Sequence, residues 1–117
     1  MFRPFTLALA FAIATPGLAQ LSNPALNLEQ TTALRCSAAF ALVAQMQEQG
    51  DASQYPLLEE RGREFFVRSI ARVMDETGAT REQVVTLMAE QVEGLSDQSE
   101  LDAAMPPCLL LLEASGL

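Results

Sequence analysis

Apolar residues recur at helical spacing through most of the chain after residue 27, and no β-hairpin signal interrupts them. Asn27, with Gln30 three residues later, has the form of a capping box, and neither Gly nor Pro follows until Gly50. The pattern predicts a first helix over 28–49. Its expected apolar stripe comprises Leu28, Thr32, Cys36, Ala39, Phe40, Val43 and Met46.

The second predicted helix, over 56–77, has the clearest division between an apolar and a charged face. Pro56 suits the first helical position, and Gly78 suits the position just after the last turn. On the charged face, acidic residues precede Arg68 and Arg72 at four-residue steps. The apolar face comprises Leu58, Gly62, Phe65, Phe66, Ser69, Ile70, Val73 and Met74.

Gly62 is unusual because it lies on the expected buried face of this helix. A glycine in a helix interior costs about 1 kcal/mol relative to alanine. Its presence favours the close approach of a neighbouring helix. The alternative is a gap that admits a ligand beside Phe65 and Phe66, so the three residues are a candidate helix contact or pocket.

A third helix is predicted over 81–93, between the capping-box pair Thr80 and Gln83 and the stop at Gly94. Its inward positions are Val84, Leu87, Met88, Val92 and Leu95. A short turn or helix then runs to residue 104.

Pro106 and Pro107 are expected to interrupt the chain before a last helical segment that ends at Ser115. Residues 108–112 of that segment are apolar on all sides, which predicts burial on several sides. The fold class is therefore all-α, a small bundle of about four helices.

Two cysteines, Cys36 and Cys108, are expected to form one disulfide that links the first helix to the last. Cys36 belongs to the apolar stripe, so its sulfur should face the core. The alternative is two separate buried thiols, since free cysteine often packs as a small apolar residue.

The N-terminus has the form of a cleaved signal peptide. Arg3 precedes an apolar run over 5–14, and small residues occupy the positions before a cleavage site at Ala19. The run is too short to span a bilayer, so no stable membrane anchor is expected after cleavage. The predicted parts are a signal peptide at 1–19, a flexible arm at 20–26 and a single helical domain at 27–117, with a periplasmic or secreted location.

The charge of the chain disfavours some partners. The 117 residues carry a net charge of −8, and removal of Arg3 with the signal leaves six arginines, no lysine and fifteen acidic residues, a net charge of −9. Such a protein is repelled by nucleic acid, so no nucleic-acid partner is expected.

The residue types needed for most catalytic and metal sites are scarce. The chain has no histidine, which removes the commonest general base and metal ligand. We therefore predict no catalytic residues, no cofactor and no metal. The exception would be chemistry that uses carboxylates alone, for which the candidate clusters are Glu59-Glu60 with Glu64, Asp75-Glu76, and Asp97 with Glu100 and Asp102.

The expected function is that of a small exported helical protein of the binding or interaction type. Its partner would be an unknown envelope protein or a second copy of the chain. In size, export, helicity and single cysteine pair, the chain is similar in outline to the acid-activated periplasmic chaperones of the HdeA type, which implies a holdase-type stress chaperone as the alternative. A carrier of an apolar ligand is the third possibility.

Overall fold

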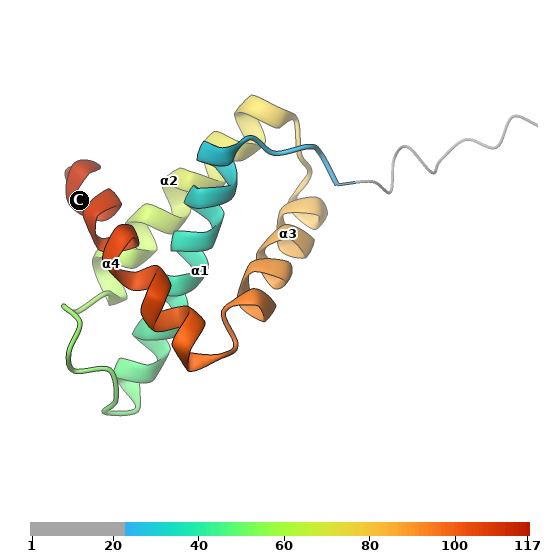
Figure 1. Cartoon of the computed structure of the whole chain (residues 1–117). Coiled ribbons are helices and arrows are strands. Elements are labelled where there is room, and N and C mark those ends of the chain that lie inside the picture. Colours follow the sequence, from blue (N-terminus) through green and yellow to red (C-terminus); the bar gives the residue numbers. More distant parts are fainter. Residues whose placement is uncertain (1–22) are drawn as a thin grey trace, which may run out of the picture.

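The computed structural model describes residues 23–117, which form four helices and no strand (Figure 1). The helices are α1 (Leu28–Glu48), α2 (Glu59–Thr77), α3 (Arg81–Gly94) and α4 (Gln98–Ala114). The predicted all-α fold of about four helices is confirmed. The predicted signal peptide at 1–19 lies outside the described residues, as does the part of the predicted arm before residue 23.

Helix α1 is the central element, because it packs against each of the other three helices (Figure 1). Its buried residues therefore extend around the helix: Gln30, Leu34, Cys36, Ser37, Ala38, Ala39, Phe40 and Val43. The predicted stripe is wrong at Leu28, whose side chain is 83% exposed. Leu28 is the first residue of α1, at the end of the helix, and burial begins only with the following residues.

The predicted capping boxes are present at two helix starts. The Asn27 side chain accepts a hydrogen bond from the Gln30 N–H at 2.8 Å, and the Gln30 side chain accepts one from the Asn27 N–H at 3.0 Å. Thr80 and Gln83 make the same reciprocal pair at the start of α3. The backbone N–H groups at the start of a helix have no partner within the helix, and these side chains supply one.

Helix α2 begins at Glu59 rather than at the predicted Pro56, because the Gln47 side chain of α1 holds the connector in another conformation. The Gln47 amide donates to the carbonyl oxygens of Pro56 at 2.9 Å and Tyr55 at 3.3 Å. Its oxygen accepts from the Leu58 N–H at 3.1 Å. The Tyr55 hydroxyl also donates to Asp102 of α4 at 2.6 Å, which further fixes the connector.

The prediction that Pro106 and Pro107 interrupt the last helix is wrong, since α4 continues through both. Each proline lacks the N–H that would bond four residues back, so the carbonyls of Asp102 and Ala103 lose their helical donors. All four residues are exposed, so water can pair those carbonyls. Met105, directly before the prolines, is fully buried and holds this part of α4 in the core.

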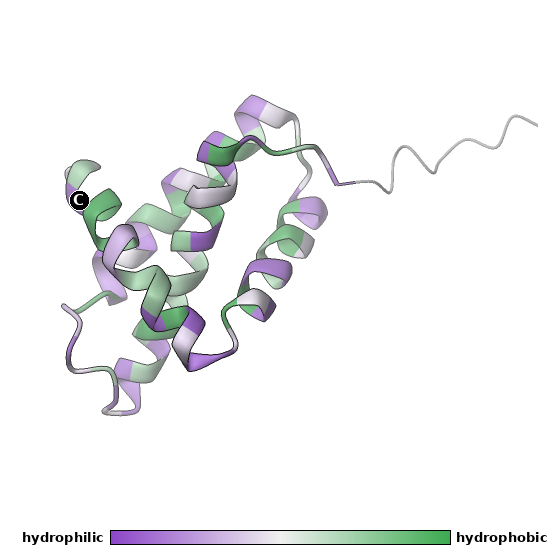
Figure 2. Cartoon of the chain, in the orientation of Figure 1, coloured by the Kyte–Doolittle hydropathy of each residue, from purple (hydrophilic) through white to green (hydrophobic). Residues whose placement is uncertain are grey.

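Two further burial predictions are wrong because α3 and α4 each keep an outer face. Leu110 in the apolar tail is 73% exposed, although Cys108 and Leu112 on either side are buried. Val92 of α3 is 38% exposed. Figure 2 shows hydrophobic residues gathered near the C-terminal end of α4.

The sulfur atoms of Cys36 and Cys108 lie at disulfide-bonding distance, with their Cα atoms 5.2 Å apart. Both residues are only 2% exposed. The pair joins the middle of α1 to the C-terminal half of α4, and 72 positions separate the two cysteines in the sequence.

Helices α1 and α2 approach closely at Gly62. A Cβ atom added to Gly62 would lie 3.1 Å from the Cβ of Phe40, nearer than side chains ordinarily pack. The Phe40 ring meets the Phe65 ring edge to face, with centroids 5.2 Å apart and an interplanar angle of 82°. The missing side chain at residue 62 thus leaves room for a fully buried aromatic residue.

Helix α3 rests on a smaller apolar cluster of its own. Leu34 of α1, Val73 of α2 and Leu87 of α3 are its buried members. Leu26, in the segment predicted to be a flexible arm, packs against this cluster, and the Asn23 side chain donates to Glu90 at 3.4 Å. The described end of that segment is therefore in contact with the helical domain.

Candidate functional site

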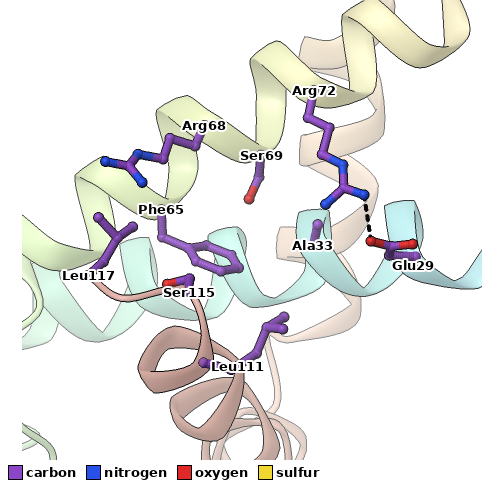
Figure 3. Close-up of a pocket in the computed structure, with 10 residues that line it drawn as sticks. Glu29, Ala33, Phe65, Arg68, Ser69, Arg72, Leu111, Ser115 and Leu117 are labelled. Atoms are coloured by element: carbon purple, nitrogen blue, oxygen red, sulfur yellow. Dashed lines mark ion pairs between the residues drawn. The ribbon is translucent and has the colours of Figure 1, made fainter.

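A groove opens where the C-terminal turn of α4 lies beside α1 and α2 (Figure 3). Its volume is about 320 Å³, at the lower end of the range for small-molecule sites. The groove is lined by Glu29, Ala33, Phe65, Arg68, Ser69, Arg72, Leu111, Ala114, Ser115 and Leu117.

The floor of this groove is apolar. The Phe65 ring lies between the helices, and Leu111 points toward it from α4 (Figure 3). Phe65 is 6% exposed and its edge-to-face contact with Phe40 supports it from the core side. Ala33 of α1 contributes only a methyl group, which leaves the space open. An apolar ligand bound here would displace water from an apolar surface that is already formed.

Two arginines of α2 stand at the rim, with different partners. Arg72 is 2.7 Å from a Glu29 oxygen across the groove and 2.6 Å from a Glu76 oxygen on its own helix (Figure 3). Arg68 lies 4.0 Å from the nearest Glu64 oxygen, at the limit of an ion pair. Both arginines therefore have acidic partners, with closer ion pairs at Arg72 than at Arg68.

The two arginines that line the groove are matched by acidic partners: Glu64 for Arg68, and Glu29 and Glu76 for Arg72. The charged residues of a neighbouring groove, Glu59 and Arg63, likewise lie 3.8 Å apart.

Ser69 adds a polar group in the middle of the floor. The residue is only 8% exposed, and its hydroxyl has no hydrogen-bond partner within residues 23–117. Figure 3 shows this hydroxyl directed into the groove between Phe65 and Arg72. The hydroxyl oxygen is open to the groove, so it can exchange hydrogen bonds with water or with an occupant.

Arg61 holds the end of the chain beside the groove. It donates to the Leu117 carbonyl oxygen from Nε at 3.0 Å and from Nη2 at 2.6 Å, and it pairs with Glu113 at 2.9 Å. Arg61 thereby ties residues 113 and 117 to α2.

The three residues singled out from the sequence do not share one cavity. Gly62 and Phe66 line the neighbouring groove, of about 250 Å³, whereas Phe65 lies on the floor of the first groove. Adjacent residues of a helix point about 100° apart, so Phe65 and Phe66 serve different surfaces. The Cys36–Cys108 pair lines neither groove.

Glu76 belongs to the ion-pair network behind the Arg72 end. The Gln30 side chain donates to it at 2.9 Å, and this hydrogen bond, followed by that from Arg72, lowers the pKa of the Glu76 carboxyl. The ionised form is favoured, so Glu76 holds Arg72 in place at neutral pH.

The acidic clusters considered for carboxylate chemistry lie on the surface. Glu59, Glu60 and Glu64 are exposed on α2, and two of them are within 4.0 Å of arginines of the same helix. Within residues 23–117, no group of three or more Asp, Glu, Cys or His side chains is placed to hold a metal ion.

Comparisons with known proteins add no functional information. No family model, curated protein or solved structure matches this chain. Among the described helices, none is both long and apolar enough to cross a bilayer.

Sequence reasoning missed most of the groove. Arg68 was expected only on the solvated face of α2, and Leu111 only in a buried tail. Arg68 and Leu111 line one groove because the end of α4 packs beside α2. No local sequence pattern predicts that contact. The available signal was Ser69, a polar residue on an otherwise apolar face.

Proposed function

We propose that this chain is a small exported binding protein whose ligand occupies the groove between α1, α2 and the end of α4. The observation that carries the proposal is the combination of an apolar floor, an arginine rim and the Ser69 hydroxyl, which opens into the same preformed groove. Convergent polar groups on an apolar surface are typical of ligand sites.

Binding is favoured over catalysis by the chemistry of the lining. Its one carboxylate, Glu29, is paired with Arg72 at 2.7 Å, and Ser69 has no histidine to activate it. A serine nucleophile requires an adjacent base, and carboxylate catalysis usually requires two converging groups.

The groove can be tested with three ten-carbon probes: decanoate, decanol and decyltrimethylammonium, each below its critical micelle concentration. We expect at least one of them to shift the backbone amide signals of Phe65, Ser69 and Leu111 in heteronuclear NMR spectra, in a saturable manner. Amides on the outer face of α3, such as Val85, serve as the control because that face is exposed and away from the groove. If no probe shifts the groove signals selectively, the proposal fails.

The proposed location is periplasmic or extracellular, after removal of residues 1–19. The form of the N-terminus supports export. The bonding-distance pair Cys36 and Cys108 supports an oxidising compartment. Any partner, whether an envelope protein or a second copy, would be met there.

Export predicts a specific intact mass for the protein isolated from its native cell. The mass should correspond to a chain that starts at Gln20. Two thiols should react with an alkylating reagent only after reduction, since the cysteines would be bonded. A full-length mass with two freely alkylated thiols would contradict export and the disulfide together.

A further inference from the structure

We propose that α3 opens as a separate unit and that residues 23–26, just before α1, form a strap that holds it closed. The three other helices remain packed together when α3 opens. Opening uncovers apolar side chains of α1 and α2, among them Leu34 and Val73. The groove described above contains no residue of α3, so this opening is separate from ligand binding there.

The three other helices are tied to one another by bonds that do not involve α3. The cysteine pair joins α1 to α4. Arg72 of α2 lies 2.7 Å from Glu29 of α1. Arg61 of α2 lies 2.9 Å from Glu113 of α4. No ion pair within residues 23–117 reaches α3, so α3 can leave without breaking any of these bonds.

Helix α3 is also held by the smaller part of the core. The larger cluster is built from α1, α2, α4 and the connectors, including Leu95 directly after α3. Helix α3 itself buries Val84 and Leu87, of which Leu87 belongs to the smaller cluster, and Met88 packs partly buried against both clusters. Because apolar burial is the main force that holds a helix on its neighbours, α3 is the helix that leaves at the lowest cost in free energy.

The strap adds contacts to this weaker end of the core. Leu26 is half-buried and packs against the smaller cluster. The Asn23 side chain donates to Glu90 of α3 at 3.4 Å. In Figure 1 the segment before α1 runs from the start of α1 toward α3. Residues 23–26 therefore join α3 to α1 from outside the helices.

Hydrogen exchange of backbone amides measures the opening, on the chain from residue 20 with the disulfide intact. A helix of fourteen residues is marginal in water on its own, so α3 loses its helical hydrogen bonds when it leaves the bundle. We expect the protection factors of α3 amides to be at least about tenfold lower than those of buried α1 amides such as that of Phe40. They should also depend less steeply on denaturant, because opening exposes less surface than unfolding.

Leu26→Ala and Leu28→Ala test the strap as a matched pair. Both leucines precede or begin α1, but Leu28 is 83% exposed and Leu26 is packed on the smaller cluster. Leu26→Ala should speed amide exchange in α3 about five- to tenfold, because it removes a contact that exists only when α3 is closed. Leu28→Ala should leave exchange in α3 unchanged.

Val43→Ala tests whether α3 opens separately. Val43 is fully buried in the larger cluster, which stays formed when α3 opens. The variant should speed exchange in α1 at least about tenfold and leave exchange in α3 unchanged. Circular dichroism of each variant verifies that it folds.

Two results would overturn the inference. Equal protection of α3 and α1, with equal responses to Val43→Ala, would show that α3 leaves only when the whole domain unfolds. Equal effects of Leu26→Ala and Leu28→Ala on α3 would show that residues 23–26 do not hold it.

Discussion

Replacing both Cys36 and Cys108 by alanine is expected to lower the free energy of unfolding by about 4 kcal/mol. The two cysteines are 72 positions apart, and a cross-link across a loop of that length strongly restricts the unfolded chain. Small domains are stable by only about 5–15 kcal/mol, so the loss is a large fraction of the total. For a domain of this size the melting temperature should fall by at least ~15 °C.

Chemical denaturation followed by circular dichroism measures this effect. The oxidised wild type should unfold at a clearly higher denaturant concentration than the double variant. Wild type that is unfolded, reduced and refolded in excess reductant should approach the variant, while the variant itself should not respond to reductant. Equal midpoints for the variant and the oxidised wild type would show that the cross-link adds no stability.

Phe40→Ala is expected to destabilise the domain by about 3–5 kcal/mol, because it removes a fully buried ring and leaves a cavity. The ring fills the contact between α1 and α2 opposite Gly62 and meets Phe65 edge to face. Loss of Phe40 should also loosen Phe65, since the groove floor is supported from behind by that contact. Binding of any probe that occupies the groove should therefore weaken as well.

Phe66→Ala is the matched control for this prediction. Phe66 has the same side chain and also lies between α1 and α2, but it is only half-buried and lines the neighbouring groove. Its loss should cost less than half as much, because part of its surface is already in water. Equal losses for the two variants, measured by urea denaturation, would contradict the central role assigned to Phe40.

The helices themselves were predictable because their signals are local. The Asn27–Gln30 and Thr80–Gln83 pairs mark two starts through hydrogen bonds within one turn. The start of α2 was misplaced because the long-range contacts of Gln47 determine it. Pro106 was misjudged for a similar reason, since the adjacent burial of Met105 outweighs the lost helical hydrogen bonds.

The candidate site was largely unpredictable because it is assembled from three helices. Phe65 and Phe66 are neighbours in sequence, yet they line different grooves. In the sequence, Arg68 resembles any surface arginine, because its place at the groove depends on where the end of α4 lies. No residue pattern within one helix contains that information, whereas the close contact at Gly62 could be anticipated from one helix alone.

The burial of the cysteine pair constrains the order of events during biogenesis. Cys36 and Cys108 are each 2% exposed, so an oxidising enzyme cannot reach their sulfurs once α4 has docked on α1. Oxidation by an enzyme is therefore expected on a chain that is still open. Once the helices close, the same burial shields the bond from reducing thiols, so its lifetime is set by how often α4 leaves α1.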